Sequence, residues 1–403
     1  MSRWSNWSGS VKCSPREILY PVNEEEVAAI VRRAGASSQV VRVAGTGHSF
    51  TPLCASDDIL LSLDRLEGVE WADTPNGLAA IHAGTKIHAL GELLVSHGLA
   101  LQNQGDVDVQ AIAGAVSTGT HGTGPTLGSI STQVVGLRIV TATGEVLDCS
   151  PEADAEVFRA AQVSLGALGV ITSVRMRLLP LYRLHEVTRR EALDHCLATL
   201  DERSQANRHF EFFWYPADDC AFTKTLNPTD LPATEPLEPI SNAAGGLASE
   251  ERERVGNSWQ IFPTVRENRF NEMEYSVPAG CGVECFLAIR DLMGRKHSNV
   301  TWPVEFRTQA ADPILISAAH GRSTVAISIH QAADLPCAEF FTDAEVIFRR
   351  HEGRPHWAKM HSLTCRELAD LYPAWDRFQD VRRRLDPQGR FLNAHLRRLF
   401  VEA

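Results

Sequence analysis

Two short segments in the second half of the sequence carry side chains that could act on a small polar molecule. Glu305 and Arg307 are two positions apart in residues 302–308, a predicted strand, so both side chains point to the same face. Ser328 and His330 share one face of a second predicted strand. Opposite charges inside an apolar domain must pair with each other or with a ligand, because removing either one from water alone is costly. From these residues alone, a structural salt bridge and a substrate site are both open.

The segment 40–50, VVRVAGTGHSF, combines a strand with a turn that could approach a charged group. Its valines predict the strand, and the Gly-Thr-Gly at 45–47 breaks it into a turn whose backbone amides could face an anion. His48 follows directly. The dinucleotide fingerprint is excluded, because a third glycine is missing and the Phe-Thr-Pro at 50–52 prevents a helix from starting. Alone, such a turn is a weak phosphate-binding signal.

A second glycine-rich segment, AGAVSTGTHGTG at 113–124, lies about 70 residues downstream. The two segments could hold one extended pyrophosphate from both sides. With them, the sequence resembles the vanillyl-alcohol-oxidase class of flavoproteins, and within it the aldonolactone oxidase branch of gulonolactone and arabinonolactone oxidases. The resemblance implies FAD as cofactor, with His48 bonded covalently to the flavin ring.

Two further segments resemble that branch closely. LQNQGD at 101–106 contains Gly105 at the position where the family has glycine in oxidases and alanine in dehydrogenases, which implies molecular oxygen as the oxidant. A glycine needed only for the turn is the alternative. RPHWAK at 354–359 is nearly identical to the family motif whose lysine, here Lys359, points at the substrate beside the flavin. A buried cation there would lower the pKa of the substrate hydroxyl and hold an anionic reduced flavin.

The resemblance also implies the site residues. SLGALGVIT at 164–172 corresponds to a segment at the adenosine end of the cofactor, and LDPQGRFLN at 385–393 to a closing motif that packs back onto the cofactor domain. The implied cofactor-binding residues are Ala44, Gly45, Thr46, Gly47, His48, Ser49, Gly105, Gly114, Ser117, Gly119, Thr120, His121, Gly122, Gly169, Val170, Ile171 and Asn393. The implied catalytic residues are Glu305, Arg307, His330 and Lys359. The implied substrate-binding residues are Asp106, Glu305, Arg307, Ser328 and Lys359.

Composition restricts the class of partner. The chain has 403 residues, 44% hydrophobic content and a net charge of −11, which argues against nucleic acid and anionic membranes, both of which favour a basic surface. No signal-peptide core and no membrane-length apolar stretch is found, so we expect a cytoplasmic protein. Nine scattered cysteines without a CxxC pair predict neither disulfides nor a metal site. A monomer or small homo-oligomer is expected.

The predicted fold is α+β, with two domains because the length exceeds what one core usually supports. The resemblance implies a vanillyl-alcohol-oxidase-type (PCMH-type) FAD-binding domain at 1–182, and a substrate or cap domain on an antiparallel sheet at 183–364. A C-terminal segment, 365–403, is expected to pack back on the FAD domain. Residues 228–258, rich in Pro, Ala, Gly and Glu, are interpreted as a loop or insertion.

The implied function is FAD-dependent oxidation of a sugar-derived 1,4-lactone of the gulono, galactono or arabinono type. Hydride would pass to flavin N5, and oxygen would be reduced to hydrogen peroxide. Lys359 and His330 are both open as acceptor of the hydroxyl proton. Two alternatives are an alditol oxidase acting on xylitol or sorbitol, and an aldonolactone dehydrogenase that uses another electron acceptor. A binding protein without catalysis is disfavoured, since it would not need the set of His48, Glu305, Arg307 and Lys359.

Overall fold

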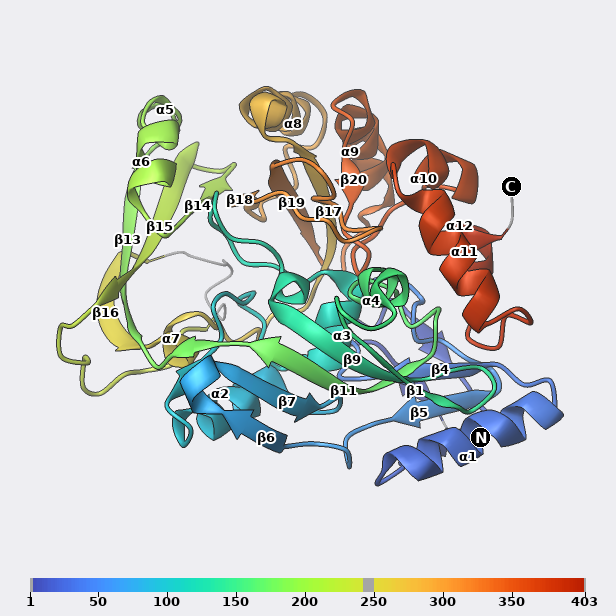
Figure 1. The fold of residues 1–403 in the computed structure, drawn as a ribbon. Coiled ribbons are helices and arrows are strands. Elements are labelled where there is room, and N and C mark those ends of the chain that lie inside the picture. The colour runs from blue at the N-terminus through green and yellow to red at the C-terminus, as the bar shows by residue number, and fades with distance from the viewer. Residues whose placement is uncertain (1–2, 242–249, 402–403) are drawn as a thin grey trace.

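The computed structural model describes residues 3–241 and 250–401 and combines helices with several sheets, which confirms the α+β class (Figure 1). A parallel three-stranded sheet carries the glycine-rich turn at 45–47, and its strands in spatial order are β3 (Glu17–Leu19), β5 (Ile59–Ser62) and β4 (Val41–Ala44). Helix α1 (Glu24–Ala36) connects β3 to β4. It begins at Asn23, whose side chain accepts a hydrogen bond from the Glu26 amide at 2.9 Å and so satisfies a free helix N–H.

The next sheet is antiparallel and has, in spatial order, the strands β10 (Val146–Cys149), β9 (Val134–Val140), β11 (Val170–Arg177), β7 (Leu78–His82) and β6 (Val69–Asp73). Two short pairs accompany it: β1 (Trp4–Ser5) with β2 (Lys12–Cys13), and β8 (Leu99–Ala100) with β12 (Leu179–Pro180). The helices of this half are α2 (Ile87–Val95), α3 (Ile112–Thr118) and α4 (Ala155–Ala161).

The second half is built on an antiparallel eight-stranded sheet. In spatial order its strands are β16 (Arg252–Asn257), β13 (Arg183–Ala192), β15 (Cys220–Thr229), β14 (His209–Tyr215), β18 (Val304–Gln309), β19 (Thr324–Ala332), β17 (Phe270–Pro278) and β20 (Arg354–Pro355). Its helices are α5 (Leu193–Ala198), α6 (Leu200–Ala206), α7 (Ser258–Ile261), α8 (Gly282–Lys296) and α9 (Ala338–Arg350).

Alternation along the central strands of this sheet separates its two faces. Phe306 on β18 contacts Phe286 of α8, and Tyr275 on β17 stacks on Phe348 of α9 at 4.9 Å between ring centroids. These helices therefore cover the apolar face, as Figure 1 shows. The residues between, such as Glu305 and Glu274, point to the opposite face, because successive strand side chains alternate.

Three helices close the chain: α10 (Cys365–Leu371), α11 (Trp375–Leu385) and α12 (Ala394–Phe400). Helix α11 packs against α4, and its Arg377 pairs with Glu156 of α4 at 2.7 Å (Figure 1). Among the described residues, every helix is too short or too polar to cross a bilayer. The domain boundaries proposed from the sequence stay a prediction.

One segment differs from the sequence-based expectation. Within the expected loop 228–258, residues 252–257 form β16 and pair with β13. The charged residues that suggested a loop are paired across the sheet, since Arg254 donates to Glu186 at 2.7 Å in a buried position. Residues 242–249 lie outside the described part of the chain. In the second glycine-rich segment, residues 112–118 are helical, and Gly119 with φ +73° ends the helix.

Candidate active site

The turn after β4 forms one wall of a cavity of about 930 Å³, which residues 44–49 line. Gly47 has φ +75°, a conformation that favours glycine, and a Cβ there would come within 3.2 Å of the Cα of Asn6. The Trp7 amide donates to the Gly47 carbonyl at 2.8 Å. The N-terminal residues therefore support the turn from behind, and glycine is required for their close approach.

The opposite wall of this first cavity comes from α3 and from the loop that precedes β11. Gly114 and Ser117 line it on one side, and Gly169 and Ile171 on the other. At its base the buried guanidinium of Arg42 donates to backbone carbonyls of three separate segments and so holds the walls together. A long cavity with glycine-rich walls from two segments suits an extended dinucleotide, so the residues present fit FAD.

His48 lies where the first cavity meets a second one, and it lines both. Burial lowers the pKa of His48 to about 4, with further lowering by the charges of Lys359 and Arg266, so the ring is neutral at pH 7. Its Nδ1 is buried and has no hydrogen-bond partner within residues 3–241 and 250–401. The edge-on ring of Trp7, 4.9 Å away between centroids, restricts the imidazole. A neutral ring with an unpartnered nitrogen at this junction suits a covalent bond to a flavin.

The second cavity has a volume of about 690 Å³ and lies against the polar face of the large sheet. It is lined by Trp7, His48, Phe50, Gly105, Asp106, Val107, Gln110, Thr120, His121, Arg266, Phe270, Glu272, Glu274, Glu305, Arg307, His330, His356, Ala358 and Lys359. This set of carboxylates, cations and imidazoles with a few aromatic rings suits a small molecule that carries several hydroxyl groups.

Glu272 on β17 holds two of the predicted catalytic residues. Its carboxylate contacts the Lys359 ammonium, and its Oε1 lies 3.6 Å from Nε2 of His330. Burial acts to raise the pKa of Glu272, but the charges of Lys359 and then His330 outweigh it, so the pKa is well below its usual range. Nδ1 of His330 lies 2.9 Å from the Pro303 carbonyl and must donate to it, so Nε2 is the nitrogen at which this ring can exchange a proton. The Glu272 carboxylate therefore holds Lys359 and the Nε2 side of His330 together at the wall of the cavity.

Glu305 is in a different protonation state. Its Oε2 lies 3.3 Å from the Arg307 guanidinium, and the side chain is buried. Burial raises the pKa of Glu305 to about 8; Arg307 opposes this rise, while Asp106 and Glu211 add to it. At neutral pH the carboxyl is protonated, so it can donate a hydrogen bond as well as accept one.

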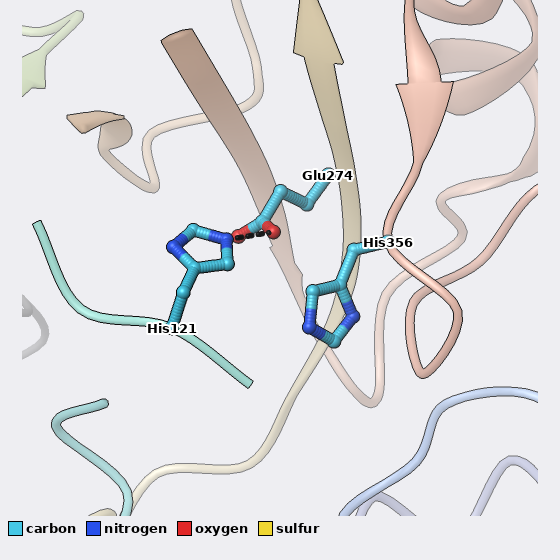
Figure 2. A group of neighbouring side chains, drawn as sticks. All are labelled: His121, Glu274 and His356. Atoms are coloured by element: carbon cyan, nitrogen blue, oxygen red, sulfur yellow. Dashed lines mark hydrogen bonds and ion pairs between the residues drawn. The ribbon is translucent and has the colours of Figure 1, made fainter. Parts of the chain in front are cut away.

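Glu274, the next glutamate on the same face of β17, is the centre of a buried cluster (Figure 2). It accepts hydrogen bonds from Nε2 of His121 at 3.0 Å, Arg307 at 2.5 Å and the Ser328 hydroxyl at 2.6 Å. His356 stands beside it, with Nδ1 accepting from the Ala358 amide at 3.1 Å. Burial lowers the pKa of His356 to about 3, so this imidazole is neutral.

The predicted site residues fall into three groups by location. The first cavity is lined by Ala44, Gly45, Thr46, Gly47, His48, Ser49, Gly114, Ser117, Gly169 and Ile171. The second is lined by His48, Gly105, Asp106, Thr120, His121, Glu305, Arg307, His330 and Lys359. The other predicted site residues lie outside both cavity linings in the described chain. Gly119 ends α3, Gly122 packs against Gln104, and Val170 begins β11. Ser328 donates to Glu274, and Asn393 caps α12 and donates to backbone carbonyls of the loop at 52–55.

Several residues of the second cavity were missed in the sequence. Glu272 and Glu274 alternate with apolar residues in FNEMEYSVP, the same signal that singled out Glu305 and Arg307. His356 is part of RPHWAK, of which only the lysine was assigned a role. Arg266, which pairs with Asp106, lies in an irregular segment and had no sequence signal.

Known families and proteins resemble this chain along most of its length. The profile of the D-arabinono-1,4-lactone oxidase family matches residues 174–245 and 232–399, and that of an FAD binding domain matches residues 15–150. L-Gulono-1,4-lactone dehydrogenase of Mycobacterium tuberculosis is 38% identical to this chain, over 98% of each chain. L-Gulonolactone oxidase of Bos taurus is 31% identical, over 99% of this chain and 98% of the bovine one.

Among solved structures, cholesterol oxidase from B. sterolicum is similar with a TM-score of 0.84 at 18% sequence identity. The alignment covers 99% of this chain and 96% of that chain. At this identity the similarity shows the fold alone, and it confirms the two-domain vanillyl-alcohol-oxidase-type fold with a substrate domain on an antiparallel sheet.

Proposed function

The chain belongs to the D-arabinono-1,4-lactone oxidase family, and we propose that it is an FAD-dependent enzyme that oxidises a hydroxyl group of a sugar-derived 1,4-lactone. The observation that carries the proposal is the junction of the two cavities at His48. The first has the length and glycine-rich walls for the cofactor, and the second collects the polar groups for a polyhydroxylated substrate. The protein is expected to act in the cytoplasm.

The cofactor is held by the residues of the first cavity. The turn at 45–49 and the helix α3 would hold its pyrophosphate and ribityl region, and residues 169–171 would face its adenosine end. His48 would carry the covalent bond to the ring system, which its neutral state and its buried Nδ1 support. When bound, FAD supplies the hydride acceptor that amino-acid side chains lack.

The chain's own residues orient the substrate and stabilise negative charge on its oxygen. Lys359 and Arg307 are cations in the wall of the second cavity, and both favour an alkoxide-like oxygen. Glu305, protonated at neutral pH, donates a hydrogen bond to a neighbouring hydroxyl. His330 takes the hydroxyl proton on Nε2, because its Nδ1 is committed to the Pro303 carbonyl. Lys359 contacts the Glu272 carboxylate, so His330 is the group that we assign as the proton acceptor.

Molecular oxygen is proposed as the final electron acceptor, with hydrogen peroxide as product. Gly105 supports this choice through its position in the wall of the second cavity, where a Cβ would come within 3.1 Å of the Thr120 methyl and 3.2 Å of the His121 carbonyl. The second candidate is a lactone dehydrogenase with another acceptor, and the name of the mycobacterial relative favours it.

The test measures oxidation by the purified yellow protein of gulono-, galactono- and arabinono-1,4-lactones, with xylitol and sorbitol alongside. Each substrate is assayed for peroxide under air and for reduction of a dye acceptor without air. Peroxide from the lactones supports the oxidase. Dye reduction without peroxide identifies the dehydrogenase, and turnover of the polyols alone contradicts the lactone assignment.

A further inference from the structure

Three residues from three separate segments close a ring of hydrogen bonds at the base of the substrate cavity. The Arg307 guanidinium donates to the backbone carbonyl of His121 at 3.2 Å and to Oε2 of Glu274 at 2.5 Å. The remaining oxygen of Glu274 lies 3.0 Å from Nε2 of His121. The main chain of His121 therefore contacts Arg307 directly, and its side chain is linked to Arg307 through Glu274. Figure 2 shows the contact between His121 and Glu274.

The partners of His121 determine how many protons its ring carries. Nδ1 lies 2.8 Å from the Gly122 carbonyl, which can only accept, so Nδ1 bears a proton. Burial acts to raise the pKa of Glu274, but the charge of the Arg307 guanidinium opposes this and the pKa lies well below its usual range, so the carboxylate is ionised and can only accept hydrogen bonds. Nε2 must then bear a proton as well. A ring with two N–H groups is an imidazolium.

The neighbouring His356 is protonated differently, although both rings are buried. Its Nδ1 accepts a hydrogen bond from the Ala358 amide, so its single proton is on Nε2. The two imidazoles and the carboxylate are close enough together to suggest a metal site. A metal ligand must offer a lone pair, and the hydrogen bonds place protons on the Nε2 atoms of both rings. The cluster is organised for hydrogen bonding and charge.

The three side chains of the hydrogen-bonded ring together carry a net positive charge beside the substrate cavity. Glu274 contributes one negative charge, and Arg307 and His121 contribute one positive charge each. The ring nitrogens of His121 are both committed, so the imidazolium supplies charge and geometry without a hydrogen bond to substrate. Without the His121 side chain, the hydrogen-bond donors left to Glu274 among the described residues would be Arg307 and Ser328. One carboxylate oxygen would then be free to draw the guanidinium away from the cavity.

We propose that His121 is a positioning residue: as an imidazolium bridging the Gly122 carbonyl and Glu274, it fixes the Arg307 guanidinium that faces the lactone. The cofactor contact expected for His121 from the sequence stays a prediction. It rests on the proposed function for the part that Arg307 plays in oxidation, whereas the protonation state of His121 does not depend on any substrate.

The first experiment examines protonation in the holoenzyme labelled with ¹⁵N-histidine, by long-range ¹H–¹⁵N correlation at pH 7. His209 is a matched control, because it is also buried and its Nδ1 lies 2.8 Å from a backbone carbonyl, that of Thr123, while its Nε2 has no partner. Signals are assigned by their loss in His121→Gln and His209→Gln. We expect imidazolium shifts for His121 and a neutral ring for His209. A neutral ring at His121 overturns the proposal.

The second experiment separates positioning from folding. In His121→Gln the amide can still donate to Glu274 but is uncharged, and we expect kcat with the best lactone to fall on the order of 100-fold, with KM changed far less. Bound FAD and melting temperature should match the wild type, and His209→Gln should keep wild-type kcat. A kcat within a few-fold of the wild type in His121→Gln overturns the positioning role.

A further variant keeps the test decisive if His121→Gln does not fold. In Glu274→Gln the ionised acceptor is gone, so His121 should lose its second proton in the same spectrum and kcat should fall similarly. If His121 is still an imidazolium in Glu274→Gln, the proposed ring of hydrogen bonds is contradicted. If the wild type oxidises no lactone, the proposed function fails, and the spectra still decide the protonation state.

Discussion

The protonation state of Glu305 can be tested by replacing it with Gln. Burial raises the pKa of Glu305 to about 8 even though the Arg307 guanidinium lies 3.3 Å away. A raised carboxyl pKa means that the proton is present below this pH and lost above it. At pH 7 about nine in ten molecules carry the proton, and at pH 9 about one in ten do.

We therefore expect kcat/KM of the wild type to fall about tenfold between pH 7 and pH 9, because the neutral carboxyl donates a hydrogen bond to substrate and the ionised form cannot. Glu305→Gln has an N–H donor in the same place and does not titrate. Its activity should stay within about tenfold of the wild type at pH 7, and its profile should be flat over this range.

The assay is the initial rate at low lactone concentration across this pH range, with Glu305→Ala as control. The alanine variant lacks the donor and should be impaired at every pH. Wild-type activity that rises through pH 8 would show that the ionised carboxylate is the active form. If Glu305→Gln shows the same fall in kcat/KM between pH 7 and pH 9 as the wild type, that fall is not caused by Glu305.

Three further substitutions test other parts of the site. Gly105→Ala should lower the rate with oxygen relative to that with a dye acceptor, because its Cβ would fill space against Thr120; an unchanged ratio would contradict an oxygen route past this glycine. His48→Ala should lose its yellow colour on acid precipitation, whereas the wild type should keep it. Lys359→Met should lower kcat/KM roughly 100- to 1,000-fold by removing a cation from the cavity, measured with the best lactone and with FAD content as control.

The sequence by itself determined the parts of the site that are continuous along the chain. The turn at 45–49 combines its glycines and His48 within a few residues, so its geometry is local and its residue types reveal it. RPHWAK likewise places Lys359 in a short segment. The placement of Glu305 and Arg307 on one face follows from strand periodicity alone, since two residues of one strand separated by one must share a face.

The tertiary structure decided which strands lie next to each other and therefore which charges meet. In the antiparallel register Glu272 is opposite His330, and Glu274 is opposite Ser328, which surrounds each glutamate with cations and hydroxyls from other strands. The alternation of polar and apolar residues along a strand indicates on which face of the sheet a side chain lies, but it does not specify the neighbouring residue on the next strand. For the same reason His121, which the motif assigned to the cofactor, lies beside Arg307 at the substrate cavity, because the loop after α3 packs against β17 and β18.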